Sequence, residues 1–268
     1  VLAIAGGAGY WFWDNGDLKS FVGTYVENGE FQTLESRYTP QQIMDIHRKA
    51  LLGDNSRQYM DPVMKYYPYA LMEVKFTHDK KTREGVVLWS LIDGEMILNT
   101  DSWESTHGFA DAINAKATKE DFKILNALAR NSLGARTQDD LLAELQLDLD
   151  VVGPWIDSVV EKHLVTRKGN TLQLHFESPK ILVIPITRFN QMIVTKPYNY
   201  GQKVPEKYSV TQVEKVARAA FGTDFNIRKI SLLYLPVHGL LVKNADDSVT
   251  TTYWNAVNGQ MIDQKYLR

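Results

Sequence analysis

The chain has 268 residues, of which 44% are hydrophobic and 23% are charged, and its formal net charge at pH 7 is −2. The small net charge excludes a global electrostatic attraction to nucleic acid or anionic lipid. The absence of cysteine excludes disulfides, thiolate chemistry and Cys-ligated metal centres. The length is sufficient for two or three small domains with their own cores.

Residues 1–13 are uncharged and end in an aromatic cluster that runs from Tyr10 to Trp13. Thirteen residues are too few to cross a bilayer, which takes about 20. Clustered aromatic residues followed by polar ones are typical of a membrane helix where it reaches the headgroups. We therefore predict that residues 1–16 are the end of a transmembrane helix. Two alternatives stay open: a buried strand, or a signal-peptide remnant with the small-x-small pattern of Ala3 and Ala5.

The flank that follows this segment is acidic, and Lys19 is its only basic residue before Arg37. Cytoplasmic flanks of membrane helices carry an excess of Lys and Arg. The flank therefore predicts that the bulk of the protein lies outside the cytoplasm, for example in the periplasm.

Two segments offset by 170 residues, which begin at Tyr38 and at Tyr208, predict helices of the same design. Each starts with a capping box, in which a hydroxyl residue (Thr39 or Ser209) precedes a Gln by three positions. In both, the apolar residues follow helical spacing and predict one buried face. That face comprises Ile43, Ile46, Ala50 and Leu51 in the first segment, and Val213, Val216, Ala217, Ala220 and Phe221 in the second.

Each predicted helix is followed by two β-rich runs. The first run begins with a Pro-containing stretch (66–76 and 234–243), and the second ends in the phrase W-x-x-x-x-G-x-M-I, at 89–97 and 254–262. Polar turns separate the runs, and Asp-Gly or Asn-Gly ends the second run. This order predicts a small α+β module made twice, in which the helix covers one face of its own strands. We expect Trp89 and Trp254 in the cores.

This layout resembles PepSY-type modules, over residues 38–98 and 208–263. The resemblance implies a helix packed on antiparallel strands. The closing strand of that family usually carries an Asp four residues before the Gly, where this chain has Ser90 and Asn255. The resemblance therefore implies the fold and leaves a role in regulating a peptidase in doubt.

Residues 116–178 differ from both flanks. Three short helical patterns, with Thr caps at Thr118 and Thr137 and with apolar spacing from Val151 to Val160, precede an alternating stretch around Lys168-Gly169-Asn170. Three helices followed by a hairpin resemble a winged-helix domain, a fold that often places its third helix in the DNA major groove.

The charge of this segment argues against DNA. From residue 116 to 179 we count eight Lys and Arg against ten Asp and Glu. The presumed reading helix carries Asp150, Asp157 and Glu161 against Lys162 alone. Phosphate contacts supply most of the non-specific affinity for DNA, and each contact needs a cation. The segment is therefore predicted to dock protein or to act as a spacer.

The sequence offers little for catalysis. It contains no G-x-x-x-x-G-K-[ST], G-x-G-x-x-G or G-x-S-x-G motif, and no two of its six histidines have H-x-H or H-x3-H spacing. We predict that His47 and His238 are semi-buried structural residues. The protein is accordingly predicted to be no enzyme, with no cofactor and no metal.

Taken together, the patterns predict an α+β protein with a membrane-helix end at 1–16, modules at 17–115 and 179–268, and a winged helix at 116–178. Residues 181–207 are expected to form a strand pair. The predicted function is a membrane-anchored adaptor or structural subunit that binds other protein subunits. The alternative is a membrane-tethered transcription regulator. Candidate partner-binding residues are Lys80, Lys81, Arg83, Tyr66, Tyr67, Tyr69, Trp155, Arg167 and Lys168.

Overall fold

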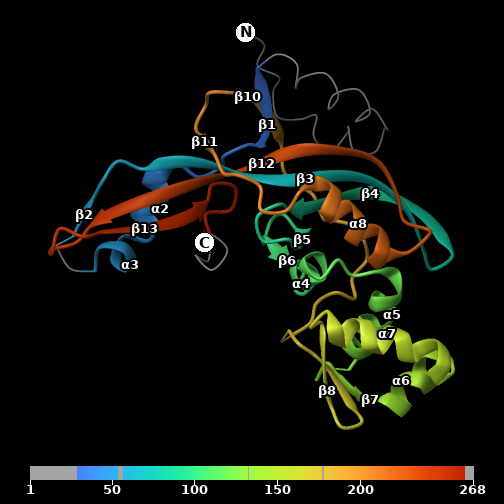
Figure 1. The fold of residues 1–268 in the computed structure, drawn as a ribbon. Helices are drawn as coiled ribbons and strands as arrows, with labels where there is room; N and C mark the ends of the chain where they lie inside the picture. The colour runs from blue at the N-terminus through green and yellow to red at the C-terminus, as the bar shows by residue number, and fades with distance from the viewer. Residues whose placement is uncertain (1–28, 54–56, 132, 177, 263–268) are drawn as a thin grey trace. The chain divides into compact units, whose positions relative to one another are not determined.

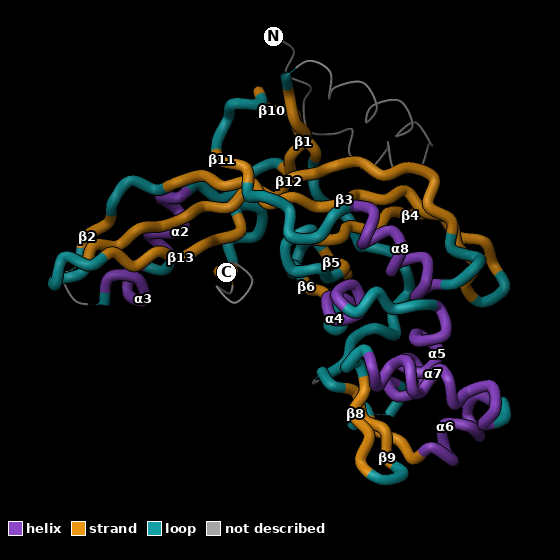
Figure 2. Tube along the Cα trace, viewed as in Figure 1, coloured by secondary structure: helices purple, strands orange, loops and turns teal. Residues whose placement is uncertain are grey.

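The computed structural model describes residues 29–53, 57–131, 133–176 and 178–262 (Figure 1). Over these residues the protein has a mixed α+β fold, as predicted, with seven helices, a large and mostly antiparallel sheet, and a separate three-stranded sheet (Figure 2). No helix in the described ranges is long and apolar enough to span a membrane. The predicted membrane-helix end at 1–16 lies outside them.

The chain forms two compact units, each assembled from separated segments. Unit 1 comprises the described residues of 1–69, 190–205 and 231–268, and unit 2 comprises those of 70–189 and 206–230. Two long strands, β3 (Val63–His78) and β12 (Asn226–Lys243), contribute residues to both units. The units therefore do not follow the contiguous ranges expected from the sequence.

Unit 1 is built on β12. This strand pairs antiparallel with β13 (Val249–Asn255) and with β2 (Gln58–Tyr59), and β13 pairs with β14 (Met261–Ile262). Strand β1 (Glu30–Leu34) meets β12 at the pair Thr33–Tyr234 and runs antiparallel to β10 (Ile193–Pro197). The short strand β11 (Gln202–Lys203) runs parallel to β3.

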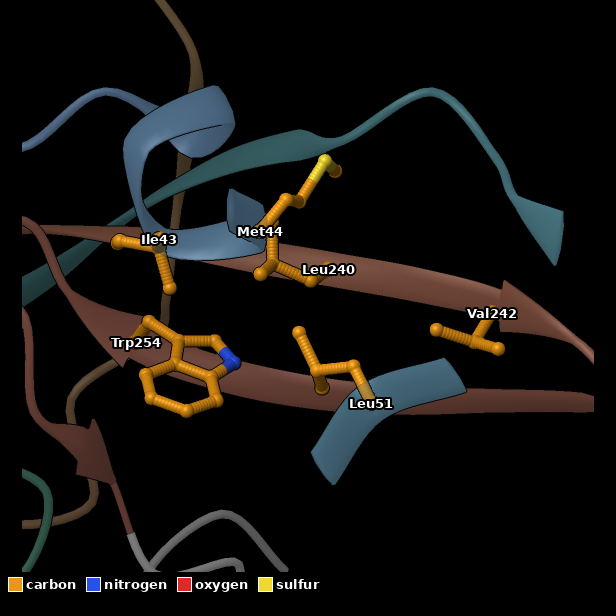
Figure 3. Close-up of a cluster of buried hydrophobic side chains, with 6 residues drawn as sticks. All are labelled: Ile43, Met44, Leu51, Leu240, Val242 and Trp254. Carbon is orange, nitrogen blue, oxygen red and sulfur yellow. The ribbon is translucent and has the colours of Figure 1, made fainter. Parts of the chain in front are cut away.

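Helices α2 (Pro40–Ile46) and α3 (Arg48–Leu52) pack on the β12–β13 pair of unit 1. Their contact is a cluster of buried side chains that Figure 3 shows pointing toward one another. The helices supply Ile43, Met44 and Leu51, and the strands supply Leu240, Val242 and Trp254. The predicted burial of Trp254 is confirmed.

In unit 2, β4 (Lys81–Ser90) pairs with β5 (Met96–Asn99), and β5 pairs with β6 (Glu104–Ser105). Helix α4 (Phe109–Asn114) follows, and helix α8 (Val210–Phe221) packs beside it. Trp89 on β4 is fully buried, with its ring centroid 4.9 Å from that of Phe109 and 6.5 Å from that of Phe221. The burial predicted for Trp89 is also confirmed.

Each helix therefore covers strands far from it in the sequence. Helix α2 lies on β12 and β13, whereas α8 packs against the Trp89 of β4. We expected each helix to cover the strands that follow it, and that expectation is wrong. The apolar faces predicted for the two helices have similar spacing, so the sequence pattern cannot distinguish the two arrangements.

The predicted capping boxes are present. The side chains of Thr39 and Ser209 accept from the backbone N–H groups of Gln42 and Gln212, and the side chains of these glutamines accept from the backbone N–H groups of Thr39 and Ser209. The first helix, however, breaks at His47, and α3 begins at Arg48. Ile46 is consequently 64% exposed, while Met44 is buried. The face predicted for the first helix is thus wrong at Ile46 and at Ala50, which is also exposed, because the buried face is centred on Ile43, Met44 and Leu51 instead.

Within unit 2, one segment contains helix α5 (Lys119–Ala129), strand β7 (Ala135–Thr137), helices α6 (Gln138–Leu145) and α7 (Leu149–Glu161), and strands β8 (Val165–Lys168) and β9 (Thr171–Leu174). The three strands form an antiparallel sheet in the order β7-β9-β8. The Thr118 and Thr137 caps are confirmed. The segment's core side chains come from the three helices and from β8 and β9: Phe122, Leu125, Leu128, Leu141, Val152, Ile156, Val159, Val165, Leu172 and Leu174.

The strand pair predicted for 181–207 is present only in part. Strands β10 and β11 lie in this range, but 181–189 forms no strand. Single backbone bonds tie this stretch to unit 2: the Thr187 N–H donates to the Val86 carbonyl at 2.7 Å, and the Arg188 N–H donates to the Leu98 carbonyl at 2.8 Å.

Candidate partner-binding surfaces

Lys162, the C-cap residue of α7, forms an ion pair inside unit 2. Lys162 Nζ lies 2.5 Å from Asp121 Oδ2, and the Asp121 carboxylate, which is fully buried, also accepts from Ser158 Oγ at 2.8 Å and from the Thr118 N–H at 2.7 Å. Burial would raise the pKa of Asp121, but the bonds from Lys162, Thr118 and Ser158 and the charge of Lys162 hold it below its ordinary value. The ion pair joins α5 to α7.

Most other cations of this segment also have internal partners. Arg130 and Arg136 both contact the carboxylate of Glu144, at 2.5 and 2.8 Å. Lys123 lies over the Trp155 ring, with Nζ 4.3 Å from the centroid. Five of the eight Lys and Arg that we counted in 116–179 are thus paired within the segment, once Lys162 and Arg167 are included.

The predicted wing-tip cations differ from each other. Arg167 donates to Gln138 Oε1 at 2.7 Å and lies 4.0 Å from an Asp157 carboxylate oxygen, so Asp157 of α7 neutralises part of its charge. Lys168 is exposed at the end of β8. Lys168 alone could contact few phosphates of a nucleic acid.

The corner between α6 and α7 exposes apolar and acidic residues side by side in sequence. Leu147, Leu149 and Val151 are 39%, 48% and 45% exposed. Asp148 is the N-cap of α7, but its carboxylate forms no capping bond, and Asp150 stands exposed in the first turn. We name these five residues, 147–151, the α7 corner. An apolar surface with an acidic rim can bind a protein segment that is both apolar and basic.

The predicted basic turn lies between β3 and β4. Lys80 and Lys81 are exposed there, whereas Arg83 lies 3.9 Å from the Asp79 carboxylate. Asp79 and Lys80 both adopt positive φ, at 52° and 59°, which forms the tight turn. The turn belongs to unit 2, as do Trp155, Arg167 and Lys168.

The predicted tyrosine cluster is interior. Tyr66, Tyr67 and Tyr69 are each no more than 6% exposed, so a partner cannot reach their rings on the folded surface. Burial, with a contribution from Tyr200, raises the pKa of Tyr66 to about 12. In the described part of the chain, the exposed tyrosines are instead Tyr198 and Tyr200, in the β10–β11 connection. Sequence reasoning missed them, although a Pro-Tyr-Asn-Tyr-Gly stretch flanked by lysines was a usable signal.

The two singled-out histidines lie in unit 1. His238 is 3% exposed, and its Nε2 lies 2.8 Å from the Tyr38 carbonyl oxygen. Burial lowers the pKa of His238, and the bond to Tyr38 opposes that effect only in part. His47 is half-buried, and its ring centroid is 4.4 Å from that of Trp254. Both contacts fit the structural role predicted for these side chains.

Glu95 in unit 2 is a buried acid that the sequence analysis did not single out. Its carboxylate accepts from Thr106 Oγ1 at 2.7 Å and from the N–H groups of Gly108, Phe109 and Ala110 at 2.9–3.3 Å. Burial raises the pKa of Glu95, although the bonds from Thr106 and from the α4 backbone oppose the rise. All four partners are donors within one turn and one helix start, which assigns Glu95 a structural function.

Within the described ranges, no group of three or more Asp, Glu or His residues is placed to hold a metal ion. Comparison with known proteins adds no identity: no family model, no curated protein and no solved structure matches the chain.

Proposed function

We propose that this protein is a non-catalytic, membrane-tethered adaptor or structural subunit of a larger assembly. Its body is built from two copies of one helix-plus-sheet module with a winged helix inserted between them. The observation that carries the proposal is the charge arrangement of the inserted segment, which pairs most of its cations internally and exposes the apolar and acidic α7 corner.

Matched contacts support the duplication. The N–H groups of Arg37 and Tyr38 both donate to the Ala256 carbonyl at 2.9 Å, and those of Lys207 and Tyr208 both donate to the Leu91 carbonyl at 2.9 Å. Leu91 and Ala256 each stand two residues after the Trp of the shared phrase. A bond made twice at equivalent positions, in units 1 and 2, is a three-dimensional counterpart of the sequence repeat.

The closing turns match as well. The Ser90 N–H donates to the Glu95 carbonyl at 2.9 Å, and the Asn255 N–H donates to the Gln260 carbonyl at 2.8 Å. In each turn the side chain of the residue before Gly accepts from the backbone N–H two positions on: the Glu95 N–H donates to Asp93 Oδ1 in unit 2, and the Gln260 N–H donates to Asn258 Oδ1 in unit 1. These paired bonds favour one ancestral module over two unrelated ones.

The element order favours the winged helix. Helix, strand, two helices and a two-stranded hairpin, with the first strand paired to the hairpin, is the arrangement expected for that domain. Its presumed reading helix, α7, carries Asp150, Asp157 and Glu161 exposed, and its Lys162 is held by Asp121. A duplex would be repelled by this helix, whereas a basic protein segment would be attracted to it.

The test measures assembly size after the membrane fraction is solubilised. The wild-type chain is expected to migrate as part of an assembly heavier than its own 30.5 kDa. Replacing Leu149 and Val151 by Ser, or Asp148 and Asp150 by Asn, is expected to shift it toward the monomer. The Leu133→Ser variant, which alters another leucine that is 78% exposed, serves as control.

Migration of the wild type as a free monomer would overturn the assembly role. Corner variants that stay in the assembly would remove the α7 corner from the proposal and leave the assembly in place.

A further inference from the structure

Strands β10 and β11 place two lysines on one face of unit 1. In the β1–β10 ladder Lys196 stands opposite Phe31, and in the β3–β11 pair Lys203 stands opposite Tyr66. Residues opposite one another in a sheet point to the same face. The rings of Phe31 and Tyr66 are in edge contact, with centroids 4.9 Å apart, so both lysines lie on the same face.

Aromatic rings surround these two cations. Lys203 Nζ lies 4.1 Å from the Phe31 centroid and 3.9 Å from the Tyr198 centroid, and it donates to the Tyr198 carbonyl. Lys196 Nζ lies 5.1 Å from the Tyr200 centroid. Cation–π contact compensates only part of the hydration that a half-buried ammonium loses.

Among the described residues, no carboxylate lies within ion-pair distance of either ammonium. This distinguishes the face from the inserted segment of unit 2, where five of the eight cations are paired internally. We name Lys196, Tyr198, Tyr200 and Lys203 the lysine–tyrosine face. Its charge is available to an anion from outside the chain.

The two tyrosines are exposed yet held in position. Tyr198 is 63% and Tyr200 is 48% exposed. Gly201 follows with φ of +74°, and a Cβ there would lie 2.6 Å from the Tyr66 ring, so the connection packs closely on the core. Amphipathic tyrosine rings beside lysines with long apolar stems are typical of protein surfaces at the level of lipid headgroups.

The position of β1 makes such a contact geometrically reachable. Glu30 begins β1, 14 residues after residue 16, where the predicted membrane segment ends. A chain of that length spans at most about 50 Å even when fully extended. A short tether keeps a surface at high effective concentration near its target.

We propose that the lysine–tyrosine face binds anionic phospholipid headgroups of the membrane to which the chain is tethered. The inference rests on the tether of the proposed function. Each lysine near an anionic surface strengthens binding about fivefold, so the two together account for about 25-fold. Tyr198 and Tyr200 add apolar contact at the headgroup boundary.

The test uses the absence of cysteine, which allows one environment-sensitive fluorophore to be attached at a chosen position. Asn199→Cys, between the two tyrosines, places the label on the face, and Asn170→Cys places it at the hairpin turn of unit 2. The labelled full-length chains are mixed with phosphatidylcholine vesicles, with or without about 30% phosphatidylglycerol, which gives the vesicles a negative surface. Flotation measures attachment of the whole chain, and the blue shift of the label measures contact of the face.

The expected result is a blue shift at residue 199 with anionic vesicles only, lost in high salt and absent at residue 170. Lys196→Gln with Lys203→Gln should weaken the salt-dependent shift about 25-fold, whereas Lys196→Arg with Lys203→Arg should keep it. Lys119→Gln with Lys168→Gln removes the same charge from unit 2 and should leave the shift unchanged.

The outcomes separate the two proposals. Flotation with neutral and anionic vesicles alike, without a response at residue 199, supports the tether and overturns the lipid contact. A response at residue 199 without flotation on neutral vesicles supports the lipid contact and contradicts the tether. A response that the Gln variants do not weaken overturns the lysine-dependent contact and assigns the shift to apolar insertion alone.

Discussion

At the scale of single residues, the clearest functions of polar groups in this protein are structural. His238 and Glu95 are both almost fully buried, one in each unit, and each has its partners within its own unit. Spacing motifs in the sequence indicated neither set of partners, because apart from the Thr106 hydroxyl the bonding groups are backbone carbonyl and N–H groups that carry no sequence signal. Their consequences can be tested through stability.

Burial of His238 is expected to make the folded protein less stable in mild acid. Its pKa is lowered in the folded protein, so the unfolded chain takes up the proton first, near the ordinary value of about 6.5. Stability from this residue is therefore complete above that pH and falls as the pH drops below it. Thermal unfolding midpoints at pH 7.5 and 5.5 are expected to differ less in His238→Gln than in the wild type.

The control is His163→Gln, which alters an exposed histidine and should leave the wild-type difference in place. An equal pH dependence in His238→Gln and the wild type would contradict the burial of a neutral imidazole.

Truncation of Glu95 is expected to lower the free energy of unfolding substantially. Glu95→Ala removes the acceptor for Thr106 Oγ1 and for three N–H groups at the start of α4, leaving buried donors without partners. The free energy of unfolding, measured by urea denaturation, should fall by about 2–4 kcal/mol. Gln260→Ala, at the matched but exposed position of unit 1, should change it by less than about 0.5 kcal/mol. Similar losses in both variants would refute the structural function assigned to Glu95.

At the scale of elements, a tyrosine just before each covering helix, α8 in unit 2 and α2 in unit 1, packs on a glycine turn. In unit 2 a Cβ on Gly94 would lie 2.9 Å from the Tyr208 ring, and in unit 1 a Cβ on Gly259 would lie 3.1 Å from the Tyr38 ring. Both glycines have positive φ, at +77° and +74°. The tyrosines stand immediately before the capping boxes of α8 and α2, so each turn fixes the start of the helix that covers its unit.

Gly94→Ala should therefore destabilise the protein more than a backbone effect alone. A positive φ costs a non-glycine residue about 1–2 kcal/mol, and the clash with Tyr208 adds to that cost. Gly169→Ala is the matched control, because Gly169 has φ of +60° but nothing within 4 Å of its would-be Cβ. Urea denaturation should show a loss for Gly94→Ala that exceeds the loss for Gly169→Ala by about 1–3 kcal/mol. Equal losses would mean that the tyrosine is not packed on the turn.

At the scale of the whole molecule, the proposed adaptor differs from a tethered regulator in its response to DNA. A protein that neutralises several phosphates loses affinity steeply with salt. Because five of the eight cations in 116–179 are paired internally, we expect no salt-dependent binding to duplex DNA at micromolar concentrations of the purified chain. Fluorescence anisotropy of a labelled random-sequence duplex between 50 and 200 mM salt, roughly the range over which such binding collapses, measures this. A steep salt slope, lost in Arg167→Gln with Lys168→Gln, would instead favour the regulator.

The sequence by itself determined the features that depend on neighbours along the chain. Capping boxes at Thr39 and Ser209, turns at Asp93-Gly94 and Asn258-Gly259, and the burial of Trp89 and Trp254 all follow from spacing and local chemistry, and the structure has them. Only the tertiary structure decided which strands each helix covers, that Ile46 is exposed, and that lysines 196 and 203 share a face. The physical reason is that the sequence pattern does not say which strands an apolar helix face covers or which group a charged side chain pairs with. Only packing in three dimensions selects these partners.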